Sequence, residues 1–290
     1  MDKVTGKTAI VTGGASGIGF GVAKSFVNAG MQAVLADFRQ DHLERALEHF
    51  KGRGQRDRVH GIRLDVTDRA AMAAAADETE RIFGKIHVAV NNAGVGIQGP
   101  LAAAKYDDWD FGVGVNLGGV INGLQTFLPR IRAHGEGGYI VNTASLAALV
   151  VMPPFLAIYA ATKAAVIALS EAIRTELIQE NIGVTVLCPG PVKSNIHELG
   201  RNRPERFKGN SGFYAAEQEL GQRQVSPLWM EPDRVGEMVL DAMRRNALYV
   251  ITHGEWRAAA IERFDALMAA MPTEVNPAII ASMQPRHEPD

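Results

Sequence analysis

The chain has 290 residues, 47% of them hydrophobic, and a formal net charge of −2. The apolar share suits a buried globular core, and the near-neutral charge gives no electrostatic reason to expect nucleic acid or an anionic membrane as a partner. The single cysteine, Cys188, allows no internal disulfide, which indicates a reducing, cytoplasmic setting. We interpret it as a small buried residue rather than a nucleophile.

No segment of the chain reads as a targeting or membrane-spanning sequence. The N-terminus is polar and lacks the apolar core of a signal peptide. The most apolar stretch, residues 146–169, contains Pro153, Pro154 and Lys163, which a membrane span would hardly carry. We therefore expect an active-site loop followed by a buried helix, and no membrane partner.

Short apolar runs alternate with helical patterns along the chain. Strands are predicted near residues 8–12, 32–37, 59–64, 86–91, 138–143 and 183–188, with a weaker one at 248–251. Helical patterns occupy 17–29, 40–50, 68–83, about 106–133, 157–180 and 232–246. No linker interrupts them. This order predicts a single Rossmann-like, doubly wound parallel sheet with helices on both faces.

The first strand leads into a glycine-rich turn, Thr12-Gly13-Gly14-Ala15-Ser16-Gly17-Ile18-Gly19, and then into a helix. Glycine allows a tight turn and a close approach to a ligand. The helix N-terminus offers N–H groups and a favourable dipole to a pyrophosphate. The spacing is G-x-x-x-G-x-G rather than the commoner G-x-G-x-x-G. With a strand before it and a helix after it, the turn predicts nucleotide binding.

Asp37 ends the second predicted strand, about twenty positions beyond the glycine turn. A carboxylate there can accept a hydrogen bond from a ribose 2′-hydroxyl and repels a 2′-phosphate. Arg39 is close, but the sequence does not give its direction. The alternative role for Asp37 is a turn or helix cap before Asp41. We favour NAD over NADP.

Residues 106–133 form a long helical pattern that contains several glycines, each of which costs about 0.5–1 kcal/mol relative to alanine. Close packing of this helix on the sheet or across a subunit boundary would offset that cost. Further along, Tyr159 and Lys163 stand at i and i+4, on one helix face. A neighbouring ammonium favours the phenolate, and lowering a tyrosine pKa from ~10 to ~7–8 takes roughly 3 kcal/mol. The alternative is an ordinary surface pair.

Two segments lie outside the alternation. Residues 191–230 are irregular, and we expect them to form a lid over a substrate; the alternatives are a plain surface loop or an oligomer contact. We expect a C-terminal helical extension over 255–290 after a domain spanning 1–254, with a loosely held tail from Pro272. Apolar residues recur there at helical spacing, which indicates core or subunit packing: Trp256, Ala260, Ile261, Phe264, Leu267, Met268 and Met271.

The glycine turn, Asn91-Asn92-Ala93-Gly94, Asn116, Ser145, Tyr159, Lys163 and Pro189-Gly190 together resemble the short-chain dehydrogenase/reductase family, in its order and approximate spacing. The match covers about residues 5–252. Residues 193–196, 211–214 and 246–251 resemble a bacterial branch that includes aryl-ether alcohol (C-alpha) dehydrogenases. In the family, the helices near 106–133 and 157–180 often form the dimer face of tetramers, so we expect a homodimer or homotetramer.

The resemblance implies the catalytic roles. Tyr159 would be the general acid/base, and Lys163 would lower its pKa and hydrogen-bond the nicotinamide ribose. Ser145 would hold the substrate oxygen. Asn116 would kink its helix and position a water joining Lys163 to solvent; the alternative is a polar residue satisfied locally.

The resemblance also implies the cofactor contacts. Asp65 and Val66 would embrace the adenine; Asp68 is better placed than Asp65 to cap the following helix. Ser194 stands where the family frequently has threonine, and it keeps the hydroxyl. The full set of predicted cofactor residues is Gly13, Ser16, Gly17, Ile18, Gly19, Asp37, Asp65, Val66, Asn92, Ala93, Gly94, Tyr159, Lys163, Pro189, Gly190, Val192 and Ser194. The histidines, His197 among them, show no metal-ligand spacing, and we assign no metal.

The leading hypothesis is an NAD-dependent dehydrogenase of a hydrophobic, aromatic or alicyclic, secondary alcohol. The alternatives are an NADP-dependent ketone or 3-oxoacyl reductase, and a non-catalytic nucleotide-binding scaffold. Apolar residues around the site favour a bulky alcohol or ketone over a sugar. They are Val95, Gly96, Ile97, Gln98, Leu146, Leu149, Val150, Val151, Met152, Pro153, Pro154, Phe155, Ile196, Phe213 and Trp229.

Overall fold

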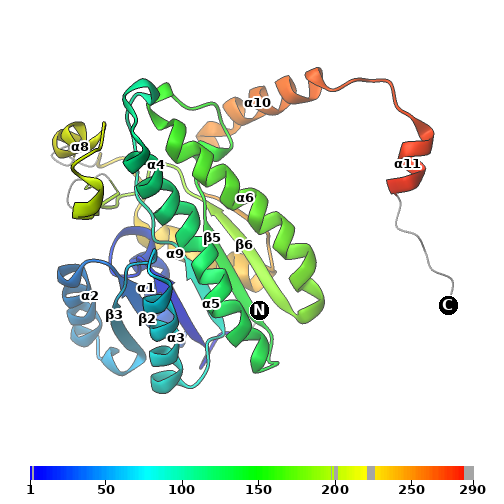
Figure 1. Cartoon of the computed structure of the whole chain (residues 1–290). Coiled ribbons are helices and arrows are strands. Elements are labelled where there is room, and N and C mark those ends of the chain that lie inside the picture. The colour runs from blue at the N-terminus through cyan, green and yellow to red at the C-terminus, as the bar shows by residue number, and fades with distance from the viewer. Residues whose placement is uncertain (2, 197, 199–201, 221–225, 284–290) are drawn as a thin grey trace, which may run out of the picture.

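Seven parallel strands form one sheet in the order β3-β2-β1-β4-β5-β6-β7 (Figure 1). This computed structural model describes residues 1–290 except 2, 197, 199–201, 221–225 and 284–290. The strands are β1 (Thr8–Thr12), β2 (Gln32–Asp37), β3 (Val59–Arg63), β4 (Val88–Asn91), β5 (Gly138–Thr143), β6 (Ile182–Cys188) and β7 (Tyr249–Ile251). Each predicted strand is present, within two residues of its predicted start.

Helices cover both faces of the sheet, which is why β1, β4 and β5 are buried along their whole length. On one face α1 (Gly17–Asn28), α2 (Gln40–Gly52) and α9 (Pro232–Arg245) pack through residues such as Phe26, Leu43 and Val239. On the other, α3 (Arg69–Phe83), α5 (Gly119–Ala133) and α6 (Ala157–Leu177) pack through Met72 and Phe127, among others. The prediction of a doubly wound Rossmann-like sheet is confirmed.

The strand order reverses beside β1, which pairs with β2 on one side and with β4 on the other. Ligands of doubly wound sheets bind beyond the carboxyl ends of the strands at such a point. The glycine turn follows β1 at this edge, and Asn92 follows β4. The topology therefore brings these two predicted motifs together.

The predicted helical stretch over 106–133 is present, and it contains one π-helical turn. α4 (Tyr106–Val113) passes into one π-helical turn, Gly114–Gly118, before α5 begins. Two glycines of α5 meet their neighbours closely: a Cβ on Gly119 would lie 2.7 Å from Val66 Cγ2, and one on Gly123 would lie 1.9 Å from Asn91 Oδ1. Packing within the chain, against the sheet, therefore accounts for these glycines.

Residues 154–180, which include α6, are long and apolar enough to cross a membrane by length and composition. Core helices of globular proteins pass the same test. In this fold α6 packs on β6 and carries Tyr159 and Lys163. The apolar residues of α6 that are buried in the core are Ile158, Val166, Ile167 and Leu177. Cys188 is fully buried, and burial raises the pKa of its thiol to about 12, so the thiol stays protonated at neutral pH.

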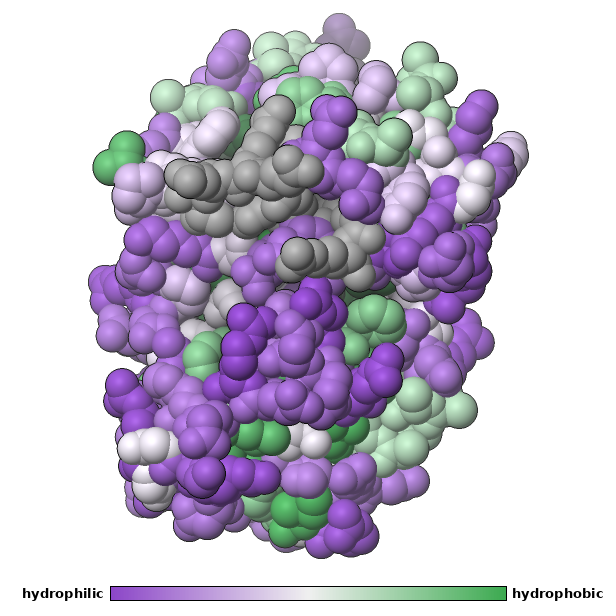
Figure 2. Space-filling view, turned by 90° about the vertical axis from the view of Figure 1, so that its left-hand side faces the viewer, coloured by the Kyte–Doolittle hydropathy of each residue, from purple (hydrophilic) through white to green (hydrophobic). Residues whose placement is uncertain are grey.

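Within the described part of residues 191–230, which we call the lid, a three-residue 3₁₀ turn, Glu205–Phe207, precedes α8 (Tyr214–Leu220). The lid is fixed to α4 by fully buried charges: Arg203 binds Glu217 at 2.8 Å and lies 3.1 Å from an Asp108 oxygen. The face that carries α2 and α8 is mostly hydrophilic, with small, separate hydrophobic groups (Figure 2).

The C-terminal extension leaves the body of the molecule. α10 (Arg257–Ala270) and α11 (Pro277–Met283) project away from the sheet (Figure 1). The apolar residues predicted to pack in a core are exposed: Ile261 at 47%, Phe264 and Leu267 at 51%, and Met268 at 64%. The core interpretation of this stripe is wrong for the single chain, and subunit packing stays a prediction.

Candidate active site

The glycine turn after β1 adopts a backbone that side chains would obstruct. Gly13 and Gly17 have positive φ angles of 63° and 49°, and a Cβ on Gly19 would lie 2.2 Å from the carbonyl oxygen of Gly13. α1 begins at Gly17 without a side-chain cap from Ser16 and without an acidic residue in its first turn. This N-terminus therefore suits a phosphate.

Hydrogen bonds tie the turn to the end of β4. The Thr12 hydroxyl oxygen accepts from the backbone N–H groups of Asn92 at 2.9 Å and of Ala93 at 3.1 Å. The Asn92 side chain donates to the carbonyl oxygens of Thr12 at 3.1 Å and Gly13 at 3.3 Å. The two strand ends are thus held as one rigid floor.

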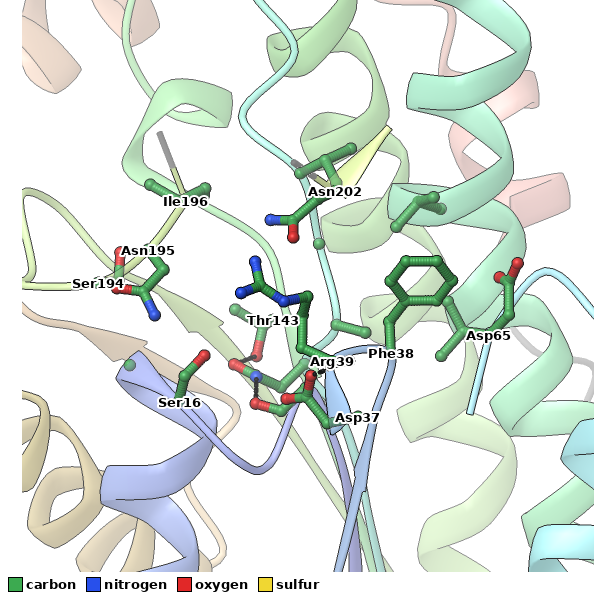
Figure 3. Close-up of a pocket in the computed structure, with 18 of the residues that line it drawn as sticks. Ser16, Asp37, Phe38, Arg39, Asp65, Thr143, Ser194, Asn195, Ile196 and Asn202 are labelled. Atoms are coloured by element: carbon green, nitrogen blue, oxygen red, sulfur yellow. Dashed lines mark hydrogen bonds between the residues drawn. The ribbon is translucent and has the colours of Figure 1, made fainter. Parts of the chain in front are cut away.

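Asp37, at the end of β2, is 6% exposed and accepts two backbone hydrogen bonds, from Ala15 at 3.1 Å and from Arg39 at 3.0 Å. Burial raises the pKa of its carboxyl, and the two hydrogen bonds oppose that rise. The Arg39 side chain, whose direction the sequence did not give, donates to Asp41 at 2.7 and 2.8 Å and extends over the cleft (Figure 3).

Asp65 uses one carboxylate oxygen locally: Oδ1 accepts from the Thr67 backbone at 2.9 Å and from its hydroxyl at 2.7 Å. The other oxygen lies 3.7 Å from Arg206 Nη2, on the lid. The helix-capping role belongs to Asp68, whose side chain accepts from the Ala71 backbone at 3.0 Å. Asp65 therefore lines the cleft rather than capping α3, and Val66 lines it beside Asp65.

Lys163 is 2% exposed, and its ammonium donates to the carbonyl oxygen of Thr143 at 2.8 Å. Its Nζ lies 5.8 Å from the centre of the Tyr159 ring. Burial lowers the pKa of Lys163 to about 8. Burial also raises the pKa of Tyr159, against a hydrogen bond with Ser145 that lowers it. The pKa of the phenol is thus raised rather than depressed as expected, because burial outweighs the hydrogen bond with Ser145.

Asn116 is fully buried in the π-helical turn and makes three hydrogen bonds. Its side chain accepts from Val95 N at 2.8 Å, donates to Val95 O at 2.9 Å and donates to the Thr162 hydroxyl at 3.3 Å. The side chain therefore holds the segment after β4 against α6. These partners lie outside the glycine-rich helix, so this is not the local satisfaction within that helix that we gave as the alternative. The role of Asn116 in a water relay stays a prediction.

One cleft of about 1170 Å³, including its opening to solvent, collects most of the predicted cofactor residues. Gly19, Gly190 and Val192 are predicted residues that do not line it, nor do Asn116 and Ser145 of the catalytic set. Gly190 lies behind the wall, where its N–H donates to Thr252 at 3.0 Å, and Val192 is buried. Sequence reasoning missed other residues that do line it: Phe38, His42, Thr67, Asn195, Asn202, Arg206 and Phe207.

Most of the predicted apolar wall residues do not line this cleft. Val95 and Ile196 line it, together with Phe111, Val115 and Phe207, which we had not singled out. Phe213 is fully buried, in a cluster with four neighbours: Val95, Ile97, Phe111 and Ile158. Val151, a predicted wall residue, is 82% exposed and points to solvent.

Comparisons with known proteins agree with this geometry. Residues 7–204 match the family described as short chain dehydrogenase. A C alpha-dehydrogenase of Sphingobium sp. (strain NBRC 103272 / SYK-6) is 42% identical over 96% of this chain and 90% of its own length. Two solved structures are similar in fold. A short chain dehydrogenase/reductase from Burkholderia phymatum in complex with NAD is 34% identical, with a TM-score of 0.85 and coverage of 95% of this chain and 99% of that one. LigO of Sphingobium sp. strain SYK-6, in its apo form, is 37% identical, with a TM-score of 0.78 and 100% coverage of both chains.

The chain belongs to the short-chain dehydrogenase/reductase family. It is an oxidoreductase of that family with a nicotinamide cofactor and a small-molecule substrate.

Proposed function

We propose that the protein is an NAD-dependent dehydrogenase of hydrophobic, aromatic or alicyclic, secondary alcohols, with Tyr159 as general acid/base. The observation that carries the proposal is the meeting of Tyr159 and Lys163 at the cleft, with Lys163 buried and its ammonium 5.8 Å from the phenol ring. The residues fit a dinucleotide: an uncapped helix N-terminus meets a phosphate, and a carboxylate lies where a ribose hydroxyl would be bound.

In oxidation, Tyr159 accepts the proton of the substrate hydroxyl, and in reduction it donates one to the carbonyl oxygen. The bound nicotinamide supplies the hydride chemistry. Ser145, hydrogen-bonded to Tyr159, holds the same oxygen. The hydrogen bond from Lys163 to Thr143 orients the ammonium beside the phenol, where its charge favours the phenolate.

NAD is preferred to NADP because Asp37 is a buried carboxylate at the end of β2. A 2′-phosphate there meets a like charge, whereas a hydroxyl donates to it. Arg39 lies nearby, but Asp41 already binds its Nε and Nη2 atoms. Titration of the protein with NADH and with NADPH, followed by fluorescence, tests this point, and tighter binding of NADPH would refute it.

For the substrate, we propose an aryl alcohol. The apolar end of the cleft has two aromatic rings, Phe111 and Phe207, with their centres 5.8 Å apart. The C alpha-dehydrogenase relative at 42% identity supports the same class. A panel of aryl, alicyclic and aliphatic alcohols with NAD, followed by absorbance of the reduced cofactor, ranks the candidates. Preference for short aliphatic alcohols would contradict the aryl assignment.

The test of the mechanism is Tyr159→Phe. We expect oxidation of the best alcohol to fall by about 10²–10⁴, with NADH affinity unchanged, because only the hydroxyl is lost. The matched control is Tyr106→Phe, since Tyr106 is 85% exposed and lies outside the cleft. Equal activity of Tyr159→Phe and wild type would refute the role of the phenol.

We also propose a homodimer or homotetramer in a reducing cytoplasm. Three large apolar side chains of α10 are more than half exposed in the single chain: Phe264, Leu267 and Met268. Exposure of such a group of apolar side chains to water is unfavourable. Association of subunits would cover them. Light scattering of the purified protein tests this, and a monomer at micromolar concentration would refute it.

A further inference from the structure

Two buried polar atoms of the cleft have no hydrogen-bond partner among the described residues: Arg39 Nη1 and Asn202 Oδ1. They come from different parts of the chain, since Arg39 follows β2 and Asn202 belongs to the lid. Figure 3 shows the two side chains extending toward one another over the pocket. Buried polar atoms are nearly always paired, so this arrangement indicates a polar ligand group between them.

The Arg39 side chain is held in its orientation. Asp41 binds its Nε and Nη2 atoms at 2.7 and 2.8 Å, which directs Nη1 over the cleft. Nη1 forms an ion pair with Glu198 at 3.6 Å, and this separation is too long for a hydrogen bond, so the hydrogen-bonding capacity of Nη1 is unused among the described residues. A donor with a fixed direction therefore faces the cavity.

Asn202 is held from its own side by the next residue in the chain. Arg203 is fully buried, binds Glu217 at 2.8 Å and donates to the Phe207 carbonyl oxygen at 3.2 Å. The lid also meets the wall of the cleft directly, where Arg206 donates to the Thr67 hydroxyl at 3.2 Å. The acceptor atom of Asn202 is thus presented by an anchored segment.

A hydroxyl group suits this pair, because it accepts from one partner and donates to the other. Both residues lie at the Asp37 end of the cleft, where the proposed function puts the adenosine ribose. We propose that Asn202 and Arg39 bind a hydroxyl of the adenosine ribose, so that the lid contacts the cofactor as well as the substrate. The inference rests on the proposed function.

The experiment is fluorescence and calorimetric titration of the full chain with NADH, ADP-ribose and reduced nicotinamide mononucleotide. Asn202→Ala is expected to weaken NADH and ADP-ribose by the same factor, about three- to tenfold for one hydrogen bond. The nicotinamide mononucleotide, which lacks the adenosine half, should bind unchanged. The matched control is Asn210→Ala, an exposed asparagine of the same lid outside the cleft, which should change none of the three.

A ligand that lacks the hydroxyl separates a direct contact from a general disturbance of the lid. The 2′-deoxy and 3′-deoxy adenosine forms of ADP-ribose should bind the wild-type protein more weakly than ADP-ribose does. For one of the two, Asn202→Ala should bind the deoxy form and ADP-ribose with nearly equal affinity, because the variant no longer contacts that hydroxyl. If Asn202→Ala binds ADP-ribose like Asn210→Ala, or if both deoxy ligands lose as much affinity on the variant as on wild type, the contact is refuted. Wild-type protein that binds neither NADH nor NADPH would instead overturn the proposed function itself, and this inference with it.

Discussion

The lid depends on a buried charge cluster, and Arg203→Leu should release it. Arg203 lies between two carboxylates that, like it, have no exposed side-chain surface, Asp108 on α4 and Glu217 on α8. Its guanidinium also stacks 4.7 Å from the Phe111 ring centre. The substitution leaves two like charges buried without a counter-charge, and loss of one partner of a buried pair costs about 3–5 kcal/mol.

We expect that cost to exceed the local stability of the lid, and the cluster lies on the lid and α4 rather than on the sheet. We therefore expect local release of the lid rather than global unfolding. A global loss of 3–5 kcal/mol would lower Tm by about 6–10 °C in a chain of this size. Local release instead shifts Tm by less than about 3 °C, while trypsin cleaves after Lys208 faster and the KM for the alcohol rises.

The triple variant Arg203→Leu, Asp108→Asn, Glu217→Gln also removes the two unpaired buried carboxylates. It should therefore resist trypsin better than Arg203→Leu alone. Arg234→Ala breaks an exposed pair with Glu237 and should leave the lid unchanged. An Arg203→Leu protein with wild-type trypsin resistance and an unchanged KM would show that the cluster does not hold the lid.

Three further predictions concern the cleft. Lys163 has a pKa of about 8 in the folded protein and near 10.5 in the unfolded chain. Between those pH values the unfolded chain binds the extra proton, so the free energy of unfolding should rise with pH, by at most about 3 kcal/mol. Denaturant titrations should show that rise up to pH 10 in wild type, and Lys163→Met should lack it. Gly19→Ala should abolish NADH binding and destabilise the chain by about 1–3 kcal/mol, because the new Cβ would lie 2.2 Å from the carbonyl oxygen of Gly13. The control Gly52→Ala should be neutral or stabilising, because a Cβ at Gly52 would meet nothing within 4 Å. Equal Tm values for the two variants would contradict this prediction. Asp37→Ser should shift the NADH to NADPH affinity ratio toward NADPH by about tenfold or more, and an unchanged ratio in paired titrations would show that Asp37 does not select the cofactor.

The fold was readable from the sequence because its signals are local. β-branched runs such as residues 8–11 mark buried strands, and the glycines between β1 and α1 mark a turn whose φ angles only glycine adopts readily. The long glycine-rich helix was the exception. Its π-helical turn, Gly114–Gly118, depends on Asn116 reaching Val95 across the fold, and no local pattern reports such a contact.

The cleft was predictable where its residues follow strands, and not where they come from the lid. Asp37 ends β2 and Asn92 follows β4, and both of these strands pair with β1. The order of the strands therefore brings the two residues to the same edge of the sheet. Asn202 and Arg206 lie in a segment without periodicity, so their place in the cleft depends on tertiary anchoring alone.

The charge cluster that anchors the lid could not be predicted from the sequence either. Asp108, Arg203 and Glu217 are charged and far apart along the chain, and charged residues are seldom fully buried unless they are paired. Each of them taken singly is typical of a solvated surface. Only the fold brings the three together, and their mutual neutralisation is what permits burial. The buried charges hold the lid together with Phe213, which is buried in an apolar cluster, whereas Phe207 is only partly buried against that cluster. Exchanging Phe207 for a residue that suits other substrates therefore need not loosen the lid. We therefore expect Phe207→Leu to change the ranking of aryl and alicyclic alcohols while trypsin resistance stays as in wild type, and loss of that resistance would show that the aromatic contact, not the charges, holds the lid.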